Sequence, residues 1–145
     1  MRPLNFPEFK FRYQKYQNKI RIFSTLRKKF IILTPEEWVR QNCVRYLVEH
    51  KGFSPQLMSE ESMIKLNGLS KRCDIVVYHS NRAIRLIVEC KSSDVAISQD
   101  TFDQIARYNL ALNADYLMIT NGINHYYCSL DYKNQTYHFL HDLPH

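Results

Sequence analysis

Apolar and polar positions alternate with a period of two through the first part of the chain. Residues 9–14 and 19–24 each alternate in this way, and Gln17-Asn18-Lys19 stands between them. Such a pattern around turn-forming residues predicts a β-hairpin, and residues 28–33 predict a third short strand. We therefore expect the chain to begin with a basic N-terminal β-hairpin.

The period then changes to that of a helix, whose start is marked in the sequence. Thr34 has the position of an N-cap, Pro35 that of the first helical residue, and Glu37 that of the capping-box partner three residues after the cap. The helix should run to about residue 51, because Gly52 is a typical C-terminal stop.

One stripe of this helix should face the core. At 100° per residue, Glu36 shares a stripe with five mostly apolar residues, which are Val39, Cys43, Tyr46, Leu47 and His50. Capping explains Glu37, whereas nothing in the local pattern explains a carboxylate on the core side. We therefore expect Glu36 to point inward.

The remainder of the chain reads as strands with one further helix. Expected strands lie at 57–66, 72–79, 83–90, 116–120, 125–130 and 136–140, and the second helix lies at about 100–112. From residue 34 the order is helix, three-strand meander, helix, strand. This order predicts an α/β sandwich with a mixed sheet.

Composition and length are those of one globular domain. The chain has 145 residues, of which 45% are hydrophobic and 23% charged. No apolar run approaches the length of a membrane span, and the first residues lack the apolar segment of a signal peptide, so we expect a cytoplasmic protein without membrane contact. The four cysteines are scattered, which predicts reduced, buried side chains rather than disulfides or a zinc site.

The net charge of +6 is concentrated at one end. Residues 1–33 contain nine Lys and Arg and one acidic residue, a net +8, and the body at 34–145 carries −2. A basic extension with interleaved aromatics, in which Arg27, Lys28 and Lys29 form the densest cluster, indicates a nucleic-acid partner. An edge hairpin protected by lysines against aggregation explains the same pattern.

Candidate chemistry lies in the two central expected strands. A turn at Ser80-Asn81 would set residue 74 opposite Ile87, so that Asp74 shares a sheet face with Glu89 and Lys91 and is the diagonal neighbour of Glu89. Two carboxylates so placed repel each other unless a cation lies between them. Mg²⁺ typically takes one or two protein carboxylates, so the pattern indicates a metal site.

The same register allows a purely structural interpretation. Arg72 would then lie opposite Glu89, and an Arg72–Glu89 and Asp74–Lys91 ladder of ion pairs would account for all four charges. Cross-strand ion pairs of this kind are common and indicate no chemistry.

Two polar residues of the second helix favour the functional interpretation. Gln104 and Tyr108 are four residues apart, on the surface opposite the apolar stripe, where they could reach the same cleft. Asp74, Glu89-Cys90-Lys91 and Gln104-x-x-x-Tyr108, in this order, resemble the PD-(D/E)xK nuclease superfamily. Residues 34–122 more narrowly resemble the type I restriction enzyme R-subunit N-terminal domain family, and the expected element order resembles the restriction-endonuclease-like core.

The resemblance implies a metal site for Mg²⁺ or Mn²⁺. Asp74 and Glu89 would bind the ion together with the backbone carbonyl of Cys90, and Glu36 matches a position from which a first-helix glutamate sometimes joins the metal. A proline often precedes the first aspartate in the superfamily, and Cys73 replaces it here.

The resemblance also implies an activity, that of a metal-dependent DNA endonuclease. Lys91 would position the attacking water and offset phosphate charge, while Gln104 and Tyr108 would contact substrate or order the site. A non-catalytic nucleic-acid-binding module with a nuclease fold is the alternative. The sequence has no G-x-x-x-x-G-K-[ST] motif, the P-loop of ATP-driven motors. A partner subunit or motor protein is therefore a candidate partner. DNA and a second copy of the chain are the other candidates.

Overall fold

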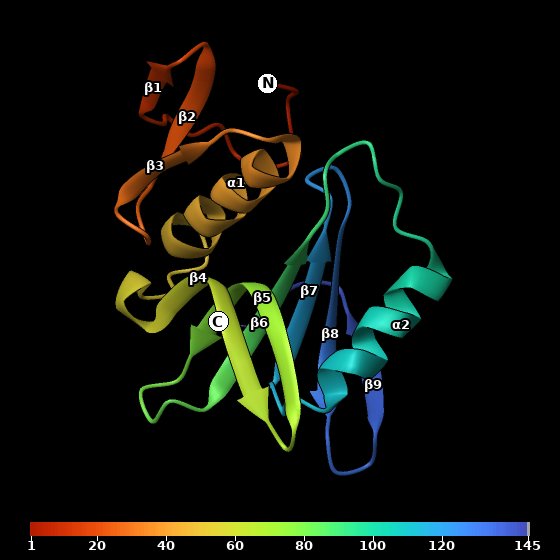
Figure 1. Cartoon of the computed structure of the whole chain (residues 1–145). Helices are drawn as coiled ribbons and strands as arrows, with labels where there is room; N and C mark the ends of the chain where they lie inside the picture. Colours follow the sequence, from red (N-terminus) through yellow and green to blue (C-terminus); the bar gives the residue numbers. More distant parts are fainter. Residues whose placement is uncertain (145) are drawn as a thin grey trace.

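The computed structural model describes residues 1–144, which form two β-sheets and two α-helices (Figure 1). The helices are α1 (Pro35–Glu49) and α2 (Gln99–Leu110), with a short 3₁₀ turn η1 (Pro55–Leu57) between α1 and the larger sheet. The strands are β1 (Tyr13–Tyr16), β2 (Lys19–Ser24), β3 (Lys29–Ile32), β4 (Met58–Leu66), β5 (Leu69–Tyr78), β6 (Ile84–Cys90), β7 (Tyr116–Thr120), β8 (His125–Asp131) and β9 (Thr136–Leu140).

The smaller sheet is the expected N-terminal hairpin with a third strand. Its order is β1-β2-β3, and both pairs are antiparallel. Gln17 and Asn18 connect β1 to β2 with positive φ values of 51° and 63°, which suits a tight hairpin turn. The hairpin prediction is confirmed, although β1 begins at Tyr13 rather than at residue 9.

The larger sheet contains six strands in the order β4-β5-β6-β7-β8-β9. Only β6 and β7 are parallel, and α2 lies on the connection between them, as a parallel crossover requires. Figure 1 shows α1 and α2 packed on different sides of this sheet. Each helix has its own buried apolar cluster against the strands. The predicted mixed α/β architecture is therefore confirmed.

The start of α1 follows the prediction, but the orientation of its acidic residues does not. The Thr34 hydroxyl accepts a hydrogen bond from the Glu37 backbone N–H at 3.0 Å. The side chain of Glu36 is 51% exposed, whereas that of Glu37 is 6% exposed. The prediction that Glu36 points into the core was wrong, because α1 buries a polar stripe containing Glu37 and Gln41 beside its apolar one.

The register between β5 and β6 also differs from the prediction. Val76 pairs with Ile87, where Asp74 had been expected, and the register shifts at an irregularity between Val77 and Tyr78. A five-residue connection at 79–83 replaces the expected tight turn at Ser80-Asn81, with the His79 N–H bonded to the Ala83 carbonyl. The paired residues of the two strands end at Ile75 and Val88, so the expected Asp74–Ile87 pair does not form.

The N-terminal residues lie against the body of the protein. The Asn5 N–H donates to the Gly122 carbonyl at 2.7 Å, and the Trp38 indole donates to the Arg2 carbonyl at 2.8 Å. Gly122 has a φ of 87°, and a side chain there would meet Leu4 at 2.8 Å, so glycine suits both the turn and the close packing.

Two further expectations concern the whole chain. All four cysteines are free and buried, as predicted. Within residues 1–144, neither helix is long and apolar enough to cross a membrane.

Candidate functional site

The site is organised where β5 and β6 lie side by side. The Asp74 carboxylate on β5 accepts a hydrogen bond from the backbone N–H of Cys90, the last residue of β6, at 2.7 Å. This contact ties the first predicted acidic residue to the Glu89-Cys90-Lys91 segment. It involves the main chain between Glu89 and Lys91, so the contact depends on the backbone rather than on either charged side chain.

Arg40 of α1 provides the nearest positive charge to Asp74. Its guanidinium lies 2.7 Å from Asp74, 2.7 Å from Glu61 and 2.6 Å from Glu37. The Arg40 side chain is only 7% exposed. Burial acts to lower the pKa of Arg40, but Asp74 and Glu37 raise it by more, so the guanidinium keeps its charge.

Glu61 reaches this cluster through an irregular backbone. Its φ of 53° is unusual for a residue within a strand. It interrupts the pairing of β4 with β5, because the Glu60–Ile75 and Ser62–Cys73 pairs flank it. The interruption lies across from Asp74, which leaves room for the side chains that gather there.

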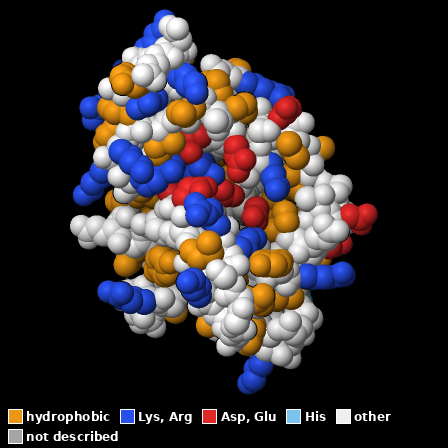
Figure 2. Space-filling model, viewed as in Figure 1, with side chains coloured by type: hydrophobic (Ala, Val, Ile, Leu, Met, Phe, Trp, Pro, Cys, Tyr) orange, Lys and Arg blue, Asp and Glu red, His pale blue; other side chains and the backbone are white. Residues whose placement is uncertain are grey.

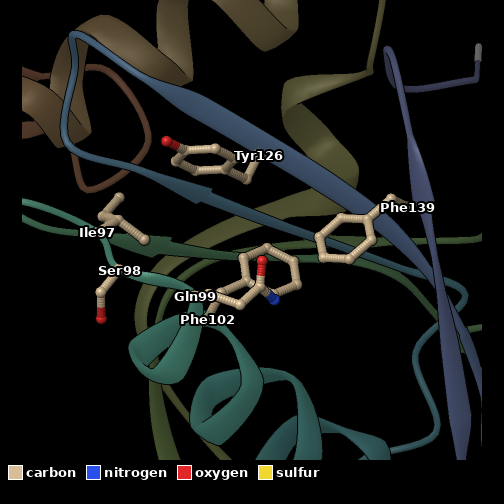
Figure 3. A pocket seen from close by; sticks show the side chains of 6 residues that line it. All are labelled: Ile97, Ser98, Gln99, Phe102, Tyr126 and Phe139. Carbon is tan, nitrogen blue, oxygen red and sulfur yellow. The ribbon is translucent and has the colours of Figure 1, made fainter.

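A second, partly buried cation extends the cluster to the smaller sheet. Arg27 lies 2.8 Å from Glu37 and 2.7 Å from Glu60, and the Gln41 amide donates to both carboxylates. Burial raises the pKa of Glu60. Figure 2 shows acidic and basic side chains gathered in the middle of this face. The charge of Arg27 is balanced inside the protein, so of the three basic residues of the extension that were predicted to contact DNA, Lys28 and Lys29 are the exposed ones.

Glu89 lies in a separate groove between the sheet and α2. Its carboxylate lies 3.0 Å from the Lys71 ammonium, and that ammonium lies 4.9 Å from the centre of the Tyr108 ring. Gln104 and Tyr108 line the groove with Lys71 and Glu89, and its volume is about 450 Å³. The structure therefore brings together Glu89, Gln104 and Tyr108, as the sequence predicted, and adds Lys71.

The ion-pair ladder offered as a structural alternative does not form. Arg72 pairs with Glu61 at 3.2 Å, Glu89 pairs with Lys71, and the cation bound to Asp74 is Arg40 rather than Lys91. The expected Arg72–Glu89 pair is absent from the observed β5–β6 register. That alternative was wrong in its pairing, although charges on these strands are indeed paired.

Lys91 and Glu36 lie at the margin of the Arg40 cluster. Within residues 1–144, no ion pair involves Lys91, whose backbone N–H donates to the Thr120 carbonyl at 2.8 Å. Burial and the charge of Asp74 raise the pKa of Glu36, while Arg40 and Lys91 act in the opposite direction. Glu36, Asp74 and Lys91 are thus near enough to influence one another electrostatically.

Sequence reasoning missed Arg40, Glu61 and Lys71. Arg40 follows Glu37 by three residues and Glu36 by four, a spacing that favours helical ion pairs and was the available signal. No sequence pattern marked Glu61, because its role depends on the backbone irregularity in β4.

The donors around Asp74 and Glu89 can be compared with what a metal ion needs. Over the part of the chain that the structure describes, no group of three or more His, Cys, Asp or Glu side chains is placed to hold an ion. Mg²⁺, however, needs only one or two protein carboxylates, since waters and phosphates complete its octahedron. Two carboxylates and the Cys90 carbonyl are hard oxygen donors of the kind that this ion prefers, so the residue types fit it. The two carboxylates contact different elements, however: Asp74 is paired with Arg40 of α1, and Glu89 is paired with Lys71 in the groove beside α2.

The chain was also compared with known proteins. Residues 35–144 match the family model described as the type I restriction enzyme R protein N terminus. No curated protein matches the chain. The matched range starts at the first residue of α1 and covers the larger sheet and both helices.

Proposed function

The chain belongs to the family of the type I restriction enzyme R protein N terminus, and from this premise we propose that it is a metal-dependent DNA endonuclease with a restriction-endonuclease-like core. The hydrolysed bond is a phosphodiester, and restriction or a related form of DNA processing is its setting. A motor, if one moves the DNA, would be supplied from outside these 145 residues, which contain no P-loop motif.

The observation that carries this proposal is the hydrogen bond between the Asp74 carboxylate and the Cys90 N–H. It holds one carboxylate against the backbone of the strand end that bears Glu89 and Lys91. A hard-ion site needs its donors fixed before the ion arrives, because ordering them afterwards costs binding free energy.

Asp74, Glu89 and the Cys90 carbonyl would hold Mg²⁺ or Mn²⁺, with Glu36 as an outer contributor. When bound, such an ion polarises the phosphate and lowers the pKa of its water. The cations Arg40 and Lys71 lie 2.7 Å from Asp74 and 3.0 Å from Glu89 and offset the negative charge of the two carboxylates.

The remaining residues would act on the DNA. Lys91 has no carboxylate partner within residues 1–144, so its ammonium is free to offset charge on the phosphate. Gln104 and Tyr108, both exposed in the Glu89 groove, would contact the DNA backbone or bases there. Lys71, held between Glu89 and Tyr108, adds a second positive charge to the groove.

A specific observation favours the alternative of a non-catalytic nucleic-acid-binding module. Arg40 already neutralises Asp74 at 2.7 Å, and a protein that needs no metal would keep this pair permanently. The two functions differ in a measurable way, since only the nuclease should bind Mn²⁺ in a manner that depends on Asp74 and Glu89.

The test combines cleavage with metal binding. Plasmid and linear DNA are incubated with the purified protein in Mg²⁺, Mn²⁺ or EDTA, and Mn²⁺ binding is followed by calorimetry. We expect cleavage with either ion and none in EDTA, and we expect Glu89→Gln to abolish both cleavage and Mn²⁺ binding. Glu49→Gln, an exposed substitution on α1, is the matched control and should change neither.

Two outcomes would count against the nuclease. Wild-type protein that binds DNA but neither cleaves it nor binds Mn²⁺ would establish the binding module instead. Cleavage that survives in Glu89→Gln would mean that the activity comes from a contaminant or from another site.

A further inference from the structure

One face of the smaller sheet combines aromatic side chains with arginines. We call it the outer aromatic face. Its members lie at alternate positions of the three strands, with Arg12 directly before β1, and they are Arg12, Tyr16, Arg21, Phe23, Phe30 and Ile32. Figure 2 shows basic and hydrophobic side chains intermixed over the part of the molecule where Figure 1 places this sheet.

Strand register separates this face from the side turned toward the body. Ile22 is fully buried, and its cross-strand partners are Tyr13 and Ile31, which therefore share the inner side. Arg21 pairs with Ile32, and Phe23 pairs with Phe30, so these residues point the other way. Tyr16 is two residues from Gln14, the partner of Arg21, and joins the same outer side.

The arginines of this face lie against the aromatic rings. The Arg21 guanidinium is 4.7 Å from the centre of the Tyr16 ring, and that of Arg12 is 4.5 Å from the Phe23 ring. The Phe23 and Phe30 rings are themselves 5.2 Å apart, at an angle of 69°. At these distances each guanidinium adds a positive charge beside the rings.

The charge of this face has no internal counterpart. None of the ion pairs found within residues 1–144 involves Arg12 or Arg21, in contrast to Arg27, which is paired twice. The Tyr16 side chain is 50% exposed and that of Ile32 is 45% exposed. The face thus offers both apolar area and uncompensated positive charge to whatever binds it.

We propose that the outer aromatic face binds single-stranded nucleic acid by stacking unpaired bases on Tyr16 and the neighbouring rings. Bases in a duplex are stacked on one another and cannot stack on a protein ring, whereas unpaired bases can stack on one. The phosphates between them would contact Arg12 and Arg21. A protein partner fits less well, because the first 33 residues carry a net charge of +8 and a polyanion is the complement of such a surface.

This inference goes beyond the proposed function, because it adds a binding surface for unpaired strands at a distance from the groove assigned to cleavage. Residues 35–144 match the family model, so the outer aromatic face lies outside the matched range. Binding at this face requires no metal ion. It can therefore be tested in EDTA, where a failure of the nuclease chemistry leaves the result unaffected.

The experiment measures affinity by fluorescence anisotropy in EDTA, with labelled oligo-dT, oligo-rU and a DNA duplex as probes. We expect the full chain to bind oligo-dT more tightly than the duplex, and Tyr16→Ala to weaken oligo-dT binding about tenfold. Tyr16→Phe keeps the ring and should bind as wild type does. Oligo-rU distinguishes an RNA ligand from a DNA ligand of the same chemistry.

Tyr13→Ala is the matched control. Tyr13 belongs to the same strand and is 51% exposed, but it lies on the inner side of the sheet beside Ile22. Its substitution should leave affinity unchanged. Equal weakening by Tyr13→Ala and Tyr16→Ala, equal affinity for duplex and single strand, or a Tyr16→Phe variant as weak as Tyr16→Ala would each overturn the proposal.

Discussion

The guanidinium of Arg40 lies 2.7 Å from the carboxylate of Asp74, the residue that the sequence marked as a metal ligand. A buried arginine and a divalent ion satisfy the same electrostatic need, because each brings positive charge to a carboxylate in a medium of low dielectric. An ion that binds Asp74 must therefore compete with Arg40 or share the carboxylate with it. This competition is a property of the protein that mutation can expose.

We predict that Arg40→Met destabilises the protein and strengthens its response to metal. Removing Arg40 from the buried ionic cluster leaves Asp74 without its cation, while Glu37 keeps Arg27 and Glu61 keeps Arg72. The free energy of unfolding should fall by about 3–5 kcal/mol. Mn²⁺ should restore more stability to this variant than to wild type. Urea unfolding with and without Mn²⁺ measures both effects.

Arg72→Met is the control for Arg40→Met. Arg72 also contacts Glu61, but its side chain is 63% exposed, so its loss should cost at most about 1 kcal/mol. If both variants unfolded at the same urea concentration as wild type, the Arg40 cluster would carry no stability. If Mn²⁺ stabilised neither, Asp74 would not be a ligand.

Lys91→Ala tests the role of the lysine in cleavage. The ammonium is expected to stabilise charge on the phosphate, and the loss of such a preorganised group commonly lowers the rate by about 10²–10³. Mn²⁺ affinity should stay the same or rise, because a positive charge near the ligands has been removed. Single-turnover cleavage and calorimetry separate the two. A variant that cleaves at the wild-type rate would limit Lys91 to a structural role.

The elements of the fold were predictable because each is encoded locally. Periods of two and 3.6 residues, the Thr34 cap and the Gln17-Asn18 turn depend on neighbours in sequence, and the structure has the corresponding helices and strands. The mixed sheet followed from their order. Among the described residues, it was the relations between elements that departed from expectation.

The β5–β6 register was not predicted correctly, because the alternation of apolar and polar residues does not reveal an irregularity in strand pairing. The irregularity between Val77 and Tyr78 shifts the register by one residue, and the β5–β6 pairs beyond it differ from the expected pairs by two positions. A pairing register inferred from a turn is correct only if the length of the turn is correct, and the 79–83 connection is longer than the two-residue turn assumed. The pairing of Asp74 with Arg40 was likewise out of reach, because it joins a strand to a helix far away in the sequence.

The error about which glutamate of α1 is buried, Glu36 or Glu37, has a related cause. A helical wheel identifies the apolar stripe of α1, which packs on the larger sheet, but α1 is covered on a second side as well. Ser24 and Arg27 of the smaller-sheet region lie there with Glu60 of β4. Ser24 donates to Glu60, and Arg27 pairs with both Glu60 and Glu37. A buried polar stripe has no signature in hydrophobicity.

We predict that the protein loses stability in mild acid because of the environment of His125. Its Nε2 lies 2.7 Å from the Asn5 carbonyl and its Nδ1 lies 2.7 Å from the Thr120 hydroxyl, so a neutral ring that donates to Asn5 and accepts from Thr120 satisfies both. Burial lowers the pKa of His125 below its ordinary value of 6.5 in the folded protein. As the pH falls through 6.5, the unfolded chain takes up the proton first, and stability is lost between 6.5 and the lower folded pKa.

Urea unfolding above and below that pH measures the effect. His125→Gln should remove part of the pH dependence, although it also lowers stability at neutral pH by disturbing the contact with Asn5. His138→Gln alters an exposed histidine of β9 and should leave the wild-type pH dependence in place. An identical acid response in wild type and His125→Gln would assign the dependence to other groups.

Lys28 and Lys29 are expected to contact phosphates and thereby help the basic extension to anchor nucleic acid. Each phosphate neutralised on duplex DNA contributes a slope of about −0.9 in log K against log salt, so replacing both lysines by Ala should flatten the slope by up to roughly 2. Binding should weaken similarly for all sequences, and Mn²⁺ binding should be unchanged. The charge-matched control replaces Lys65 and Lys133, exposed lysines of the larger sheet region, and should keep the wild-type slope. If the lysines only protect the edge of the hairpin, the Lys28/Lys29 variant would aggregate yet bind with an unaltered slope, and affinity measured at several salt concentrations decides between the two.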